Sequence, residues 1–150
     1  MRPSTVADRA CFLCYFRHNM MMALPTIIKP ISWLGNTKQE LSGFAEDIRD
    51  EVGQALFEAQ KGGRHSSVKP LSGYGDAGVL EVISNYSGDT FRAVYTVRWP
   101  ERIYVLHVFQ KKSKSGAKTP KGDMDLIDAR LKRLTELHAQ QAKLSKGAKK

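Results

Sequence analysis

Cysteine is scarce in this 150-residue chain, which has two, Cys11 and Cys14, in a C-x-x-C spacing. Two cysteines exclude a disulfide-rich scaffold. A structural zinc site needs four ligands, and His18 is the one further local candidate. We therefore predict free thiols in a reducing, cytoplasmic compartment, with no metal and no cofactor.

Long apolar runs are also missing. No stretch approaches the roughly 20 residues that a membrane span needs, so we expect no membrane partner. The apolar run Ala10–Phe16 is too short for a secretion signal. Three consecutive methionines, at 20–22, offer internal starts. We predict that residues 1–26 are a disordered or spurious extension, that residues 27–140 form one domain, and that residues 141–150 are a basic disordered tail.

Acidic residues are outnumbered, with 24 Lys/Arg against 15 Asp/Glu and a net charge of +9. Nearly all of the excess follows residue 110, where twelve basic and four acidic residues give +8. Such a balance indicates a polyanionic partner such as nucleic acid or the ribosome. The segment Lys111–Lys121 is either a solvated loop or a phosphate-binding loop, because it lies between a predicted strand and a predicted helix.

The strand pattern begins with an edge strand over Ile27–Leu34, which Pro30 interrupts. Strand-forming residues joined by short turns then predict an antiparallel meander of three segments, Val79–Ser84, Phe91–Val97 and Ile103–Phe109.

Two helices are predicted around these strands. Thr37 and Glu40 match a capping box, and an apolar stripe of helical period runs from there to Ala59. Thr119 as N-cap and Pro120 as first residue open the last helix. The expected fold is α+β, a small antiparallel sheet of four to five strands with the N-terminal helical region and the C-terminal helix packed on one side.

Alternation along the middle strand places Arg92 on one face of the sheet. Hairpin pairing brings the neighbouring strands alongside it, so Glu81, Arg92, Lys111 and Lys112 are expected to converge at one end. Arg and Lys there suit phosphodiester chemistry, since both neutralise charge on a phosphate. The alternative is a cross-strand ion pair between Arg92 and Glu81 on a solvated face.

The other candidates are less specific. His107 lies in an apolar strand, which is typical of a packed histidine, although it also qualifies for proton transfer. The glycine pairs lack the context of a phosphate-binding loop, and no carboxylate set suggests a metal.

A resemblance rests on an ordered set of segments: KPLSGYG at 69–75, GVLEV at 78–82, TFRAVYTV at 90–97, YVLHVFQKKS at 104–113 and KTP at 118–120. Together they resemble the RelE/HigB toxin superfamily, in particular its phage-derived HigB-like branch, over about residues 28–135. The resemblance implies the toxin of a type II toxin–antitoxin pair that cleaves mRNA in the ribosomal A site without a metal, the 2′-OH of the RNA attacking the adjacent phosphate. It also implies a cognate antitoxin, often a helix-turn-helix protein, through which promoter DNA would be contacted.

The family's site residues carry over unevenly. Arg92 falls on the phosphate-binding arginine, and Lys111 and Lys112 on a basic pair ending the last strand. Glu81 and Ile83 stand where RelE has two lysines, and the tyrosine of the final helix has no counterpart. The general base therefore stays open between three candidates, Glu81, His107 and Lys69.

Four lysines are expected to contact RNA: Lys69, Lys114, Lys118 and Lys121. Two alternatives to the endoribonuclease stay open, namely a non-catalytic RNA- or ribosome-binding phage protein and a ParE-like gyrase inhibitor on the same fold.

Overall fold

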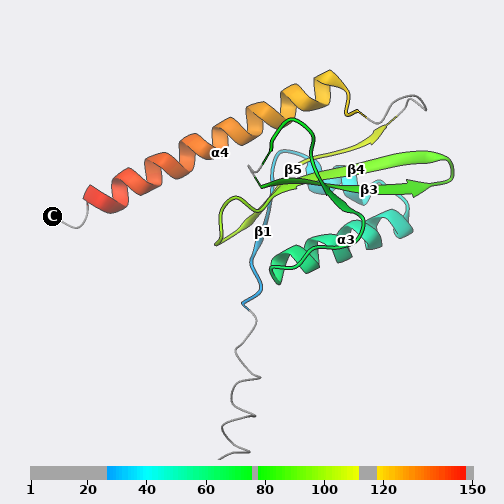
Figure 1. Ribbon diagram of the computed structural model, residues 1–150, viewed down its shortest axis with the longest axis horizontal. Coiled ribbons are helices and arrows are strands. Elements are labelled where there is room, and N and C mark those ends of the chain that lie inside the picture. The colour runs from blue at the N-terminus through cyan, green and yellow to red at the C-terminus, as the bar shows by residue number, and fades with distance from the viewer. Residues whose placement is uncertain (1–26, 76–77, 112–117, 148–150) are drawn as a thin grey trace, which may run out of the picture.

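The computed structural model describes residues 27–75, 78–111 and 118–147 (Figure 1). The predicted N-terminal extension, with Cys11 and Cys14, lies outside the described residues, as do Lys112 and Lys114. Among the helices of the described ranges, none is long and apolar enough to cross a membrane.

The fold is α+β, as predicted, and is built on a five-stranded sheet of order β1-β5-β4-β3-β2. The strands are β1 (Ile31–Trp33), β2 (Val68–Pro70), β3 (Val79–Tyr86), β4 (Asp89–Thr96) and β5 (Ile103–Lys111). The predicted antiparallel meander forms β3, β4 and β5. The sheet as a whole is mixed, because β1 pairs with β5 in parallel. No tight turn joins β1 to β5, so hairpin geometry does not set the direction of this pair.

The N-terminal helical region is two helices rather than one, α2 (Thr37–Ser42) and α3 (Glu46–Gln60). Gly43 ends α2, and the chain turns before α3 starts. The predicted capping box is also wrong in detail, since Asn36 precedes the helix and donates from its amide to Glu40 at 2.8 Å. Thr37 is fully buried inside the helix instead.

Two hydrophobic clusters lie on opposite faces of the sheet. Helices α2 and α3 cover the face that carries Phe91, Ala93 and Tyr95. The last helix, α4 (Lys121–Gly147), covers the face of Val94 through Ile127 and Leu134. Figure 1 shows α3 and α4 on either side of the sheet. The expectation that both helical regions pack on one side is therefore wrong. Apolar side chains project from both faces of the sheet, so helices cover each face.

Helix α4 differs from the prediction at both ends. It begins at Lys121, and the carbonyl of Pro120 accepts from the backbone N–H of Met124 at 3.0 Å. Thr119 is therefore not its cap. Residues 141–147, expected as tail, are helical and exposed. Ala, Gln, Lys and Leu in this stretch are good helix formers, which explains the extension.

A bulge interrupts β5. Val94 of β4 pairs with His107, whereas the next residue, Tyr95, pairs with Val105. Leu106 is thus the extra residue, and it packs on the α4 face. After the bulge, His107 shares the α4 face with its partner Val94.

Candidate active site

Arg92 and Glu81 form the centre of the site, on the α4 face of the sheet. Arg92 lies on β4 between Ile83 of β3 and Phe109 of β5. Its Nη1 donates to Oε2 of Glu81 at 2.7 Å, and both side chains are more than 90% buried. The predicted convergence of these two residues is confirmed, and the pair is buried rather than on a solvated face.

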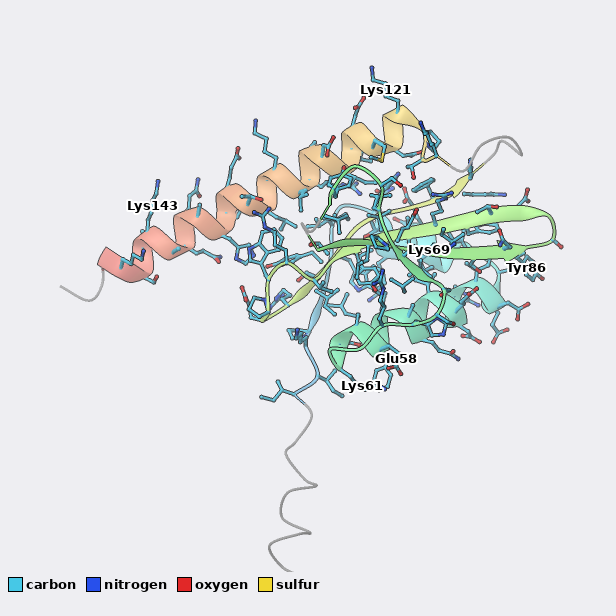
Figure 2. All side chains as sticks on the ribbon, in the orientation of Figure 1. Glu58, Lys61, Lys69, Tyr86, Lys121 and Lys143 are labelled. Atoms are coloured by element: carbon cyan, nitrogen blue, oxygen red, sulfur yellow. The ribbon has the colours of Figure 1, made fainter. Side chains whose placement is uncertain are left out.

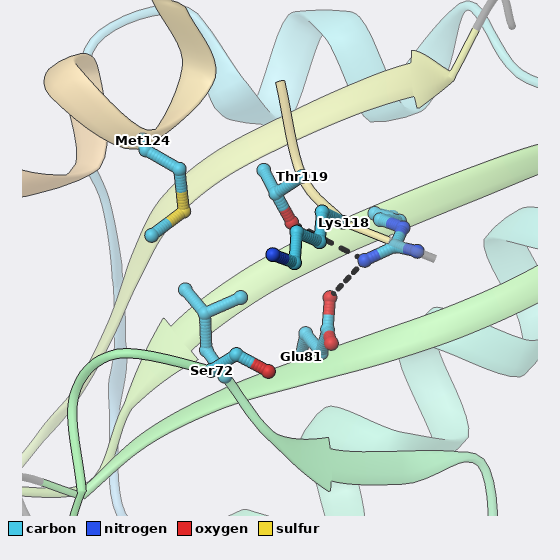
Figure 3. Close-up of a pocket in the computed structure, with 7 residues that line it drawn as sticks. Ser72, Glu81, Lys118, Thr119 and Met124 are labelled. Carbon is cyan, nitrogen blue, oxygen red and sulfur yellow. Dashed lines mark hydrogen bonds and ion pairs between the residues drawn. The ribbon is translucent and has the colours of Figure 1, made fainter. Parts of the chain in front are cut away.

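The segment before α4 closes over this pair. Thr119 Oγ1 accepts a second hydrogen bond from Nη1 of Arg92 at 3.2 Å. Arg92 and Glu81 then line a pocket of about 150 Å³ together with Leu71, Ser72, Lys118, Thr119 and Met124 (Figure 3). The pocket joins an anion-binding guanidinium, a carboxylate and an ammonium, which is a set that can hold a phosphate and move a proton.

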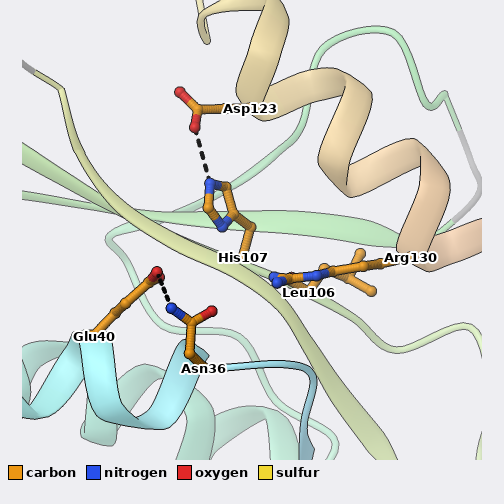
Figure 4. Close-up of polar contacts among 6 residues, drawn as sticks. All are labelled: Asn36, Glu40, Leu106, His107, Asp123 and Arg130. Carbon is orange, nitrogen blue, oxygen red and sulfur yellow. Dashed lines mark hydrogen bonds and ion pairs between the residues drawn. The ribbon is translucent and has the colours of Figure 1, made fainter.

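His107 lies beside this centre but belongs to a different contact. Its Nε2 is 2.9 Å from Oδ1 of Asp123 in the first turn of α4 (Figure 4). Its ring stacks on Phe109 with centroids 5.0 Å apart. The residue is buried and does not line the pocket. The structure therefore supports the packed interpretation of His107, with Asp123 anchoring the helix to the sheet.

The lysines divide into three groups. Lys118 lines the pocket, whereas Lys69 and Lys121 are exposed outside its lining (Figure 2). Lys69 lies in register with Glu81 on the neighbouring strand. Lys111 ends β5 opposite Thr90 and is buried, at 8% exposure, so its predicted convergence with Arg92 is not seen in the pocket lining.

The loop between β2 and β3 supplies part of the site that sequence reasoning missed. Ser72 and Leu71 line the pocket, and the hydroxyl of Tyr74 donates to Asp128 of α4 at 2.5 Å. Burial, with the Asp128 hydrogen bond, raises the pKa of Tyr74 well above its usual value. Thr119 was also missed, because its place before Pro120 resembled a helix cap. The segment KPLSGYG in the resemblance was the available signal for the loop, and nothing in the local pattern indicated its contact with α4.

No group of three or more His, Cys, Asp or Glu side chains is arranged to hold a metal ion within residues 27–75, 78–111 and 118–147.

One of the comparisons with known proteins finds a family. The family model described as "Phage derived protein Gp49-like (DUF891)" matches residues 39–132, which include the pocket residues from Leu71 to Met124. Neither the curated proteins nor the solved structures contain a match to the chain. The match spans more than half of the sequence, and the chain belongs to the Gp49-like family of phage-derived proteins, a family of RelE-like toxins.

Proposed function

We propose that the protein is the toxin of a type II toxin–antitoxin system, of the HigB-like kind, and that it cleaves mRNA on the ribosome. The observation that carries this proposal is the Arg92–Glu81 pair at the wall of a pocket that also contains Lys118. By its resemblance to the RelE/HigB toxins, Arg92 is the residue expected to bind the phosphate. The family membership supports the toxin, and the site supports phosphodiester chemistry.

The reaction requires that Arg92 exchange partners. In the structure, Nη1 of Arg92 donates to Glu81 and to Thr119. A phosphate of the RNA entering the pocket would compete for the guanidinium, which binds phosphate through parallel N–H bonds. That exchange would release the Glu81 carboxylate beside the bound phosphate.

The released Glu81 is then the proposed general base. It takes the proton of the 2′-OH, whose oxygen attacks the adjacent phosphorus. The bond from phosphorus to the 5′ oxygen breaks, leaving a 2′,3′-cyclic phosphate on one fragment. Lys118 donates a proton to the departing 5′ oxygen, and Arg92 stabilises the charge that develops on the phosphate. Lys69 and Lys121 would contact the RNA backbone from outside the pocket, as point charges.

The experiment is primer extension on an mRNA in a translating extract, with and without ribosomes. The purified full chain is expected to produce site-specific 5′ ends that require ribosomes. The double variant Arg92→Met/Glu81→Leu should produce none while retaining its fold by circular dichroism. Lys38→Ala, which removes one exposed positive charge from α2, is the matched control and should cleave like the parent. Cleavage by the folded double variant at the parent's rate would rule out this site.

The burial of Arg92 favours one second candidate, a non-catalytic module that binds RNA or the ribosome. At 6% exposure, the arginine is held as a structural ion pair would be. In that case the parent chain binds ribosomes in a sedimentation assay, and no new 5′ ends appear in the same extract.

A further inference from the structure

A second hollow lies along α4, away from the Arg92 pocket. It has a volume of about 470 Å³ and is lined by Leu34, Gly35, Arg130, Arg133, Leu134 and Leu137. Met124, which lines the Arg92 pocket, and Leu137 are thirteen residues apart on α4, or roughly 20 Å along the helix axis. We call this hollow the α4 groove.

The floor of the α4 groove is held in a fixed shape. Arg130 donates from Nη1 to the carbonyl of Leu106 at 2.5 Å. Its guanidinium also crosses directly over Gly35, where a Cβ atom would lie 2.5 Å from Nη2. Gly35 has a φ of +59°, a conformation that favours glycine. Arg130 is therefore held in place on one side of the groove by its contacts with Leu106 and Gly35.

An apolar stripe leads out of the groove along α4. Leu134 is buried at 4% exposure, whereas Leu137 is 45% and Leu144 is 74% exposed. Leu137 and Leu144 are seven residues apart and so lie on the same side of the helix. Figure 1 shows this part of α4 projecting beyond the sheet. Leu134, Leu137 and Leu144 thus present apolar contacts on one side of α4, with Gln141 between the last two.

The charge of α4 changes sign along its length. The first part, residues 121–128, carries one Lys and three Asp. The part that borders the groove and projects, residues 130–147, carries five Lys/Arg and one Glu, a net charge of +4. A second copy of the chain would bring two such surfaces together, and like charges oppose that contact. Two of the five basic residues, Arg130 and Arg133, line the groove itself, so an acidic partner would be attracted to this side of the helix.

We propose that the α4 groove docks an acidic amphipathic helix of a partner protein. Aliphatic side chains of that helix enter the hollow between Leu34 and Leu137 and continue onto Leu144. Its carboxylates meet Arg133, whose guanidinium offers paired donors at the rim. That this partner is the neutralising antitoxin rests on the proposed function, whereas the docking itself does not.

The test is a selection of random 20-residue peptides by mRNA display on the immobilised full chain. Enriched peptides are expected to contain more Asp/Glu than Lys/Arg, with apolar residues at i, i+3 or i+4, and i+7. Their binding, measured by fluorescence anisotropy, should weaken at least tenfold for Leu137→Glu and for Arg133→Glu. Lys143→Glu makes the same charge change as Arg133→Glu on another side of α4 and should alter binding less than twofold (Figure 2).

Four results would overturn the proposal. The first is an enriched pool without an acidic excess, or no enrichment at all. The second is a pool whose binding is indifferent to both groove variants. The third is a 20-nucleotide single-stranded RNA whose binding falls tenfold with the same two variants, which would make the surface a nucleic-acid site. The fourth is a concentration-dependent dimer of the parent that Leu137→Glu abolishes in sedimentation equilibrium.

The proposed function is assayed separately. Leu137→Glu lies outside the Arg92 pocket and should cleave mRNA as the parent does in primer extension. Peptide binding by a parent chain that shows no cleavage would support the docking surface and count against the endoribonuclease. Cleavage by a chain that selects no acidic peptides would support the endoribonuclease and count against the docking surface.

Discussion

Arg92 and Glu81 are joined across strands β4 and β3 by a buried ion pair with 2.7 Å between Nη1 and Oε2. Each charge depends on the other, because an unpaired charge inside a protein is costly. The pair is consequently a structural element as well as the centre of the proposed site. A loss of activity on changing Arg92 alone would not separate these two roles.

Arg92→Met and Glu81→Leu should each lower the free energy of unfolding by about 3–5 kcal/mol, since each removes one half of a buried ion pair. The double variant should recover most of that loss, because two apolar residues of similar size leave no charge behind. Urea unfolding of all four proteins measures the coupling. Additive losses in the double variant would mean that the pair does not exist in solution.

Asp123→Asn should loosen the start of α4, because the carboxylate holds Nε2 of His107 at 2.9 Å. A hydrogen bond of this kind contributes about 1–2 kcal/mol, and the loss is measurable by urea unfolding. Amide hydrogen exchange in the first turns of α4 should also speed up. Asp125→Asn changes an exposed carboxylate in the same turn and is the control. Equal effects of the two variants would indicate helix electrostatics rather than the anchor.

Tyr95→Phe should make stability less dependent on alkaline pH. Burial raises the pKa of Tyr95 to about 12, with Arg64 opposing the shift. An unfolded tyrosine has a pKa of about 10, so the unfolded state loses its proton first as the pH rises. The stabilisation is complete below pH 10 and is lost between pH 10 and about 12. Thermal unfolding across this range should show the parent losing stability that the variant keeps, so that the two midpoints move apart as the pH rises.

The same substitution should do little harm at neutral pH. The Tyr95 hydroxyl is buried and has no hydrogen-bond partner among the described residues. A buried hydroxyl in that state costs about 1–3 kcal/mol, so its removal should leave stability equal or higher. A drop of more than about 1 kcal/mol at pH 7 would show that the hydroxyl has a partner after all.

Gly35→Ala should destabilise the protein by at least 1–2 kcal/mol, the approximate cost of a left-handed conformation for a residue with a Cβ atom. The new atom would also displace the guanidinium of Arg130 from above the glycine. Gly53→Ala is the matched control, because its position inside α3 leaves open space around a Cβ atom. That change should stabilise α3 by up to about 1 kcal/mol. Thermal unfolding distinguishes the two outcomes.

The local sequence pattern was sufficient to predict the strands and helices whose contacts are close in sequence. The meander from Val79 to Lys111 follows from alternation and short turns, and it places Arg92 beside Glu81 without further information. The parallel pairing of β1 with β5 and the position of β2 were not predictable in that way. Both depend on contacts between segments far apart in the chain, which three-residue strands do not encode.

The candidate site was predictable to the same extent. Glu81 and Arg92 were found because they lie on adjacent strands of one hairpin. Thr119 was not, since its hydroxyl reaches Arg92 only after α4 has packed on the sheet. Lys111 was expected in the site as a charged residue, and its burial reflects packing at the end of β5 that alternation does not reveal.

The bulge at Leu106 decides which face of the sheet every later side chain of β5 points to. Strict alternation from Val105 would turn His107, Phe109 and Lys111 toward α3, away from Arg92. One added residue exchanges the two faces for everything downstream, whereas no single substitution could do so. In a relative of this chain, inserting or deleting one codon here would therefore move the counterparts of His107, Phe109 and Lys111 to the other face of the sheet. An alignment that ignores gaps in β5 would compare residues from opposite sides of the sheet.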